Sequence, residues 1–140
     1  MILTAKQEEG LKIAVARYKA HEAYTCISGY AGTGKSTLIK FIIAALGLEP
    51  EQVCYVAYTG KAAQVLKQKG CPNPYTAHKL LYRAKPMPNG TFKFEPKPAL
   101  SEGLEVIIVD EVSMLPKEMW LRLLSHRIHV IACGDPFQLP

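Results

Sequence analysis

The sequence predicts an α/β fold in which a parallel sheet has helices on both faces. Four short, mostly apolar runs have the length and composition of strands buried on both sides, at 24–28, 53–57, 105–109 and 129–133. Helical patterns lie between these runs, and parallel strands need such crossover connections. The length of 140 residues fits one domain or part of one.

The helices are predicted from their ends as well as from their periodicity. Thr4 and Gln7 form a capping-box pattern that opens a helix to about Ala20. Pro116 is typical of a first helical turn. The segment 70–74, rich in glycine and proline, ends the helix before it. The remaining helices are expected at 35–46, 61–69, 76–83 and 116–125.

The segment 85–98 is rich in proline, so we exclude it from the core. Within it, Asn89-Gly90 is a strong signal for a two-residue type I′ hairpin turn. We therefore expect a small inserted hairpin at about 84–100. The sequence ends at Pro140, directly after a predicted strand, and we expect the fold to be incomplete at its C-terminus.

Basic residues are concentrated in one part of the chain. The net charge is +5, yet residues 61–97 hold eight lysines or arginines and a single acid, Glu95. Such a stretch indicates contact with a polyanion. A solvated, lysine-rich surface is the alternative that the charge alone leaves open.

The cysteines and apolar runs indicate the compartment. Cys26, Cys54, Cys71 and Cys133 form no C-x-x-C pair, so the pattern supports neither zinc nor a disulfide. The pattern fits buried free thiols best, three of them in strands. Free thiols in turn indicate a reducing compartment, the cytoplasm. The longest apolar run, 41–48, is too short to span a bilayer, and the N-terminus is unlike a signal peptide. We expect no membrane partner.

A complete phosphate-loop motif, G-x-x-x-x-G-K-S, lies between a predicted strand and a predicted helix. Its backbone N–H groups and the helix N-terminus are suited to phosphate oxygens. Lys35 is expected to reach the β- and γ-phosphates of ATP, and the Ser36 hydroxyl to bind Mg²⁺. The motif and the hydroxyl after it comprise Gly29, Tyr30, Ala31, Gly32, Thr33, Gly34, Lys35, Ser36 and Thr37.

An acidic pair follows the apolar strand at 105–109. Asp110 fits the role of a Mg²⁺ ligand, and Glu111 can act as the general base that polarises an attacking water. A solvated acid pair at a strand end is the plainer alternative. The second acid favours hydrolysis over nucleotide binding alone.

Together these motifs resemble those of superfamily 1 helicases, and among them the RecD-like enzymes of superfamily 1B. The resemblance implies a P-loop NTPase fold of the RecA-like type, of which 1–140 is the N-terminal part of the first motor domain. Leu3-Thr4-x-x-Gln7 is similar to the Q motif, 29–37 to motif I, 57–63 to motif Ia, 76–78 to motif Ib, 110–114 to motif II and 134–140 to motif III.

The resemblance implies roles for two glutamines. Gln7 would bind the adenine edge through its amide; completing the capping box is the alternative, and both roles are compatible. Gln138 would contact the γ-phosphate, because the family's motif III strand lies between those of motifs I and II. It would join Lys35, Asp110 and Glu111 as a catalytic residue, with a purely structural role as the alternative.

The resemblance also implies contacts with DNA. A track for single-stranded DNA would be lined by Thr59, Gly60, Lys61, Thr76 and His78. Phe92 and Phe94 of the hairpin would stack on the base pair at a duplex fork, as a separation pin. The alternatives are a capping or packing role for His78 and packing of both rings onto the domain.

We therefore expect a helicase that hydrolyses ATP with Mg²⁺ and moves on single-stranded DNA, 5′ to 3′ by resemblance. Its motor would need a second RecA-like domain from the rest of the chain, and its partners would belong to replication or recombination. The 140 residues alone are expected to be weakly active or inactive. Two alternatives are a truncated nucleotide-binding module and a P-loop kinase, which the acid pair and Gln138 fit poorly.

Overall fold

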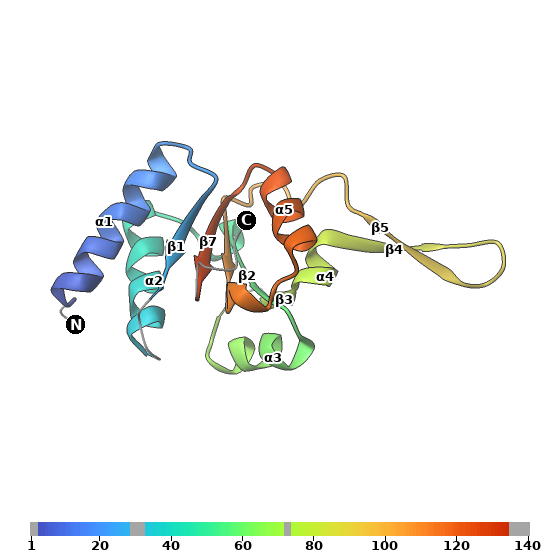
Figure 1. Cartoon of the computed structure of the whole chain (residues 1–140), viewed down its shortest axis with the longest axis horizontal. Coiled ribbons are helices and arrows are strands. Elements are labelled where there is room, and N and C mark those ends of the chain that lie inside the picture. Colours follow the sequence, from blue (N-terminus) through green and yellow to red (C-terminus); the bar gives the residue numbers. More distant parts are fainter. Residues whose placement is uncertain (1–2, 29–32, 72–73, 135–140) are drawn as a thin grey trace.

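The computed structural model describes residues 3–28, 33–71 and 74–134. Within these residues a five-stranded sheet has only parallel neighbours, and helices lie on both of its faces (Figure 1). The strands follow the spatial order β1 (Tyr24–Ile27), β7 (His129–Cys133), β6 (Val106–Val109), β2 (Val53–Ala57) and β3 (Pro74–Thr76). The predicted α/β class is confirmed, in the RecA-like arrangement that the resemblance implied.

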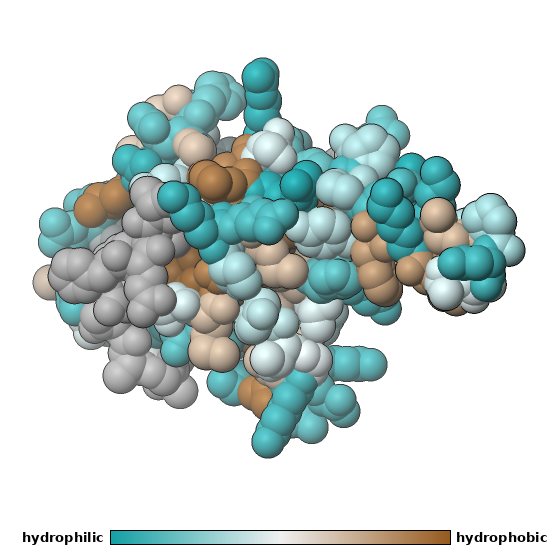
Figure 2. Space-filling view, turned by 45° about the vertical axis from the view of Figure 1, so that its right-hand side comes forward, coloured by the Kyte–Doolittle hydropathy of each residue, from teal (hydrophilic) through white to brown (hydrophobic). Residues whose placement is uncertain are grey.

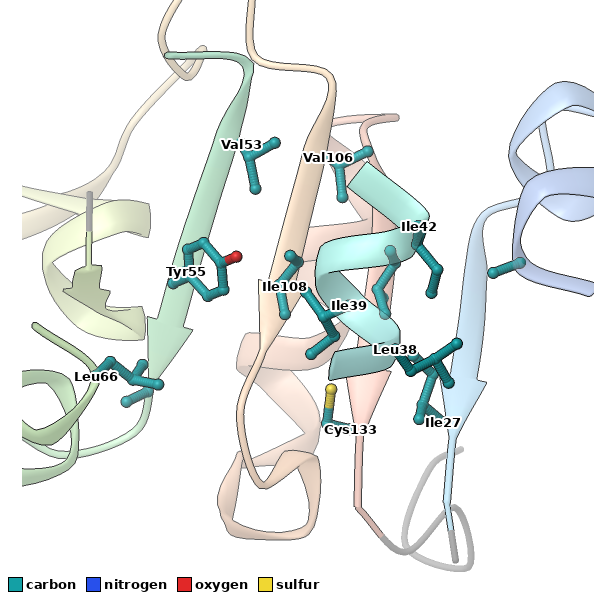
Figure 3. Packing of buried hydrophobic residues seen from close by; sticks show 13 residues of the cluster. Ile27, Leu38, Ile39, Ile42, Val53, Tyr55, Leu66, Val106, Ile108 and Cys133 are labelled. Atoms are coloured by element: carbon teal, nitrogen blue, oxygen red, sulfur yellow. The ribbon is translucent and has the colours of Figure 1, made fainter. Parts of the chain in front are cut away.

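Two apolar clusters hold the helices against the sheet. The helices are α1 (Ala5–Lys19), α2 (Thr33–Leu46), α3 (Gly60–Gln68), α4 (Ala77–Leu81) and α5 (Lys117–Ser125). Successive strand residues point to opposite faces, so Val53 and Tyr55 pack with α1, α2 and α3, whereas Cys54 and Val56 pack with α4 and α5. Figure 3 shows the first cluster, with α2 lying across the strands. The central strands β2, β6 and β7 are therefore buried on both faces, whereas the outer strands β1 and β3 are only partly covered.

The predicted boundaries of the core elements agree closely with the structure. The strands at 53–57 and 129–133 have the predicted ends, and α1 begins at the predicted capping box. Both capping-box hydrogen bonds are present, from the Gln7 amide to Thr4 Oγ1 and from the Thr4 amide to Gln7 Oε1. Local signals determine these elements, so they could be found without tertiary information.

The region after α3 differs from the prediction. Pro74–Thr76 forms β3, which adds to the sheet beside β2. The sequence predicted only the end of a helix at 70–74 and the start of the next helix at 76. The helix predicted at 76–83 covers only Ala77–Leu81, because Tyr82 already has extended backbone and begins another strand. A strand of three residues has too little sequence pattern to be recognised, and pairing with β2 decides its conformation.

The predicted insert corresponds to an antiparallel hairpin of β4 (Tyr82–Pro86) and β5 (Phe92–Pro96), which projects from the body of the molecule (Figure 1). The predicted type I′ turn is wrong. Gly90 donates to the Met87 carbonyl and has a φ of 84°, whereas Asn89 is not among the described residues with positive φ. Pro88 sets the φ of an ordinary type I turn, and Gly90 follows it in the left-handed region.

No helix in the described part of the chain is both long and apolar enough to cross a bilayer. The four cysteines are free; Cys54 and Cys133 are buried, whereas Cys26 and Cys71 are half-buried. The expectation of free thiols is confirmed, although Cys26, on the edge strand β1, is less buried than expected. No cluster of three or more metal-binding side chains occurs among the residues that the structure describes.

Candidate functional site

The strand order brings the predicted motifs to one edge of the sheet. All carboxyl ends of parallel strands lie at the same edge, where ligands of open α/β sheets bind. Since β7 lies between β1 and β6, the residues that follow these strands, Ser28, Gly134 and Asp110, are neighbours there. The order implied for the strands of motifs I, III and II is thereby confirmed.

Lys35 and Asp110 are in direct contact at this edge. Lys35 Nζ, in the first turn of α2, lies 2.9 Å from Oδ1 of Asp110, at the end of β6. Burial opposes the charge on Lys35, but the hydrogen bond and the negative charge of Asp110 outweigh it, and the pKa of Lys35 is raised above 10.5. The side chain is therefore a cation at neutral pH, aimed at the acidic pair.

Glu111 adopts a backbone conformation that is unusual for its residue type. Its φ of 49° and ψ of 67° lie in the left-handed region, immediately before the 3-10 helix η2 (Val112–Met114). Such strain in a non-glycine residue costs about 1–3 kcal/mol and often occurs at functional sites. Glu111 is exposed at this turn, and its charge acts on Lys35 of the ion pair.

Gly134 allows Glu111 to lie where it does. A Cβ atom at Gly134 would be 2.8 Å from Oε1 of Glu111, and Gly134 has a φ of 120°, which disfavours any side chain. The amide of Gly134 donates to the Ile27 carbonyl, which fixes the end of β7 against β1. The absence of a side chain at residue 134 therefore leaves room for the carboxylate.

Gln7 lies against the phosphate-loop helix. Its side chain is 8% exposed, and its Nε2 donates to the Gly34 carbonyl over 3.0 Å while its Oε1 accepts from the Thr4 amide. The capping role that the sequence predicted is therefore present. The bond to Gly34 was not predicted, because it joins α1 to α2 across 27 residues of sequence.

The other predicted nucleotide residues are described only in part. Ser36 is exposed and Thr37 half-buried, both in the first turns of α2. Gly34 is within the same helix, which begins at Thr33. Gly29, Tyr30, Ala31, Gly32 and Gln138 lie outside the described residues.

Cys133 forms the floor of the site. It is the last residue of β7 and is 1% exposed, and Figure 3 shows its sulfur pointing toward α2. Burial, together with the nearby Asp110 and Glu111, raises the pKa of its thiol to about 12, although Lys35 acts in the opposite direction. The thiol is therefore neutral and adds no charge below the ion pair.

The predicted DNA residues of motifs Ia and Ib lie at the same edge. Thr59 is the N-cap of α3 and accepts from the Ala62 amide, and Thr76 is the N-cap of α4 and accepts from the Lys79 amide. Gly60 and Lys61 are exposed in the first turn of α3. The two threonine hydroxyls thus have local structural partners, and their contact with DNA stays a prediction.

His78 belongs to a small aromatic cluster at the base of the hairpin. Its ring stacks on Tyr82 with 4.9 Å between centroids, and Phe94 meets it edge to face at the same separation. The guanidinium of Arg122 lies over the Tyr82 ring, 5.6 Å from its centroid. His78 and Phe94 therefore make packing contacts, although Phe94 is 58% exposed, and their contact with DNA stays a prediction. Phe92, 65% exposed, has no ring contact among those described.

The hairpin has two chemically different faces. Directly paired residues of antiparallel strands point to the same side. The β4–β5 register therefore places Arg83, Lys85, Lys93 and Glu95 on one face and Tyr82, Ala84, Pro86, Phe92, Phe94 and Pro96 on the other. Figure 2 shows hydrophilic and hydrophobic residues side by side on this projection. A basic face and an aromatic face together suit a nucleic acid.

A family model described as an AAA domain matches residues 3–140. The chain belongs to the AAA domain family. This AAA domain is 33% identical over 127 residues to the ATP-dependent DNA helicase dda of Enterobacteria phage T4, covering 88% of this chain and 28% of that protein. It is 29% identical over 153 residues to the RecBCD enzyme subunit RecD of Mycolicibacterium smegmatis, covering 90% of this chain and 27% of that protein.

These matches confirm the resemblance to RecD-like superfamily 1 helicases. The AAA domain spans little more than a quarter of the length of either relative. The site also gives roles to two residues for which the sequence predicted none there, Gly134 at the start of motif III and Cys133 before it. A glycine directly after a buried strand is a usable signal for a close approach, whereas the position of Cys133 under Lys35 depends on the strand order alone.

Proposed function

We propose that this AAA domain binds ATP with Mg²⁺ at the carboxyl edge of its sheet and that the whole protein is a DNA helicase. The single observation that supports this most is the 2.9 Å contact of Lys35 with Asp110, beside Glu111. It joins motif I to motif II across 75 residues of sequence. A cation, a carboxylate and a second acid at one helix N-terminus suit a triphosphate and an attacking water.

Each group has a role in hydrolysis. Lys35 binds the β- and γ-phosphate oxygens, and Glu111 takes a proton from the water that attacks the γ-phosphorus. The bond from that phosphorus to the bridging oxygen then breaks, which gives ADP and phosphate. Gln7 binds the adenine edge, and Gln138 contacts the γ-phosphate. The backbone of Gly29, Tyr30, Ala31, Gly32, Thr33 and Gly34, with Thr37, surrounds the phosphates.

The residues present fit a magnesium ion. Ser36 offers a hydroxyl and Asp110 a carboxylate, the hard oxygen ligands that Mg²⁺ prefers alongside water and phosphate. Oδ1 of Asp110 already pairs with the Lys35 ammonium, so the space beside this oxygen favours a cation. Bound Mg²⁺ would neutralise charge on the phosphates.

Contact with DNA is proposed for the surface that continues from the nucleotide site. Thr59, Gly60, Lys61 and Thr76 follow β2 and β3 at the same edge, and His78 connects them to the hairpin. The basic residues of 61–97 supply attraction for phosphates, and Phe92 supplies an exposed ring for a base at a duplex fork. The relative dda is named as a DNA helicase. Movement 5′ to 3′, a second RecA-like domain and replication or recombination partners belong to the same proposal.

The test is ATP hydrolysis by the whole protein with and without single-stranded DNA. We expect DNA to stimulate hydrolysis, and we expect Lys35→Met to reduce the stimulated rate by about 10²- to 10³-fold, as loss of a charged transition-state donor does. A rate of ATP hydrolysis that does not change when DNA is added would contradict the helicase proposal. Transfer of the γ-phosphate to a small acceptor would instead identify a kinase.

A further inference from the structure

The amide of Gln7 contacts two other parts of the chain at once. Oε1 accepts from the Thr4 amide over 2.9 Å, and Nε2 donates to the Gly34 carbonyl over 3.0 Å. Both partners have fixed polarity, since a backbone N–H only donates and a carbonyl only accepts. The orientation of the amide is therefore unambiguous, and the side chain links the start of α1 to the first turn of α2.

This link explains why residue 7 is glutamine. A capping box accepts glutamate as readily as glutamine, since both supply an oxygen for the N-cap amide. Only glutamine also has an N–H group for the Gly34 carbonyl. A glutamate carboxylate would place an oxygen against that carbonyl, with no proton between them. The second contact, and not the capping box, therefore distinguishes the two residue types.

Gly34 lies directly before Lys35 in the helix whose free N–H groups face the phosphate site. A carbonyl oxygen has two lone pairs, and in a helix the amide four residues later takes one of them. Gln7 thus donates to the second lone pair of the Gly34 carbonyl oxygen, which the helix itself does not use. Because Gln7 is buried and fixed by Thr4, it restrains the position of the first turn of α2.

We propose that Gln7 is a positioning residue that holds the phosphate-binding turn through the Gly34 carbonyl, in addition to any contact with adenine. This inference rests on the proposed nucleotide site. The amide keeps one N–H and one oxygen lone pair free for a base edge. Gln7 would therefore connect the base and the phosphates of one ligand, so its loss would weaken binding even of a ligand that has no base.

The experiment compares ATP with inorganic tripolyphosphate as ligands of the whole protein. Gln7→Met removes both amide contacts and keeps an unbranched neutral side chain of similar length. Thr4→Val is the matched control. It removes the other capping-box hydrogen bond, from the Gln7 amide to Thr4 Oγ1, but leaves the Gly34 contact in place. Each variant thus loses one capping hydrogen bond of α1.

We expect Gln7→Met to weaken tripolyphosphate binding about three- to tenfold, the usual worth of one neutral hydrogen bond, and to weaken ATP binding at least as much. Thr4→Val should bind tripolyphosphate like the wild type. If Gln7→Met weakens ATP binding alone, Gln7 acts through the base only and the inference is wrong. Equal losses in both variants would also overturn it, because helix stability would then account for the effect. A wild-type protein that binds neither ligand would refute the proposed nucleotide site itself.

Discussion

The ammonium group of Lys35 is hydrogen-bonded to Oδ1 of Asp110, so the lysine of motif I and the acid after β6 neutralise each other. Both side chains are partly exposed at the carboxyl edge of the sheet. A bound triphosphate would replace the Asp110 carboxylate beside Lys35, and a bound Mg²⁺ would replace the Lys35 ammonium beside Asp110. Each side chain would then exchange its partner for another of the same sign.

The raised pKa of Lys35 predicts how stability changes in alkali. The folded state holds the lysine proton more tightly than the unfolded state, so the stabilisation is present below about pH 10.5 and is lost as the pH rises through the folded pKa. Lys35→Met should lower the free energy of unfolding by about 1 kcal/mol at pH 8.5, a value discounted for solvent screening. The difference from wild type should vanish above that pKa. Chemical unfolding across pH 8.5 to 11 measures it.

Lys40→Met is the control for this prediction, because Lys40 is an exposed lysine of the same helix. At pH 8.5 it should change the free energy of unfolding less than Lys35→Met does. A pH-independent effect of Lys35→Met would show that the ion pair with Asp110 contributes nothing to folding.

Gly134→Ala should damage hydrolysis more than it damages the fold. The new Cβ would lie 2.8 Å from Glu111 Oε1 and displace the proposed base, and misplacement by about 1 Å can cost about 10²-fold in rate. Gly103→Ala is the matched control, because Gly103 has a φ of 86° and a Cβ atom there would meet nothing within 4 Å. Both variants should lose stability from backbone strain, because both glycines have positive φ. Similar turnover numbers in the two would rule out a spatial role for Gly134.

The two phenylalanines of the hairpin should behave differently. Phe94→Ala removes a ring packed on His78 and should lower the free energy of unfolding by about 0.5–1.5 kcal/mol. Phe92→Ala removes an exposed ring and should leave stability unchanged while it slows strand separation. Unwinding of a forked duplex, ATP hydrolysis with DNA and thermal unfolding are the measurements. Normal unwinding by the double alanine variant would refute the proposed separation pin.

Acid should destabilise the end of the sheet opposite the proposed site. His129 Nδ1 donates to the Glu22 carbonyl over 2.7 Å, and Nε2 lies 2.8 Å from Thr25 Oγ1. Burial, the largest cause, lowers the pKa of His129 below 6.5, although the Glu22 carbonyl opposes the shift. The unfolded state therefore takes up the proton first, and stability falls as the pH drops below about 6.5.

His129→Asn removes this titration while it keeps an N–H donor near the position of Nδ1. The wild type should lose more stability than the variant between pH 7.5 and pH 5, as measured by chemical unfolding. Parallel losses in the two proteins would mean that His129 does not couple folding to protonation. His126 titrates in both proteins and so cancels from the comparison.

Local signals in the chain were enough to define most of the core elements. The capping box of Thr4 and Gln7 marked the start of α1, and the apolar runs marked β2 and β7 with their observed ends. Motif spacing likewise identified Lys35, Asp110 and Glu111. Hydrophobic period and capping chemistry act over a few residues, so they can be recognised without knowledge of the fold.

Which of these residues touch depends on the folded arrangement. The contact of Lys35 with Asp110, the link from Gln7 to Gly34 and the closeness of Gly134 to Glu111 each join segments that are distant in the chain. The contacts of Asp110 and Gly134 depend on β7 lying between β1 and β6, whereas the Gln7 link depends on the packing of α1 against α2. Likewise, β3 exists as a strand only because β2 is beside it. Strand pairing is a non-local interaction whose energy comes from the partner, so no local pattern in the chain encodes it.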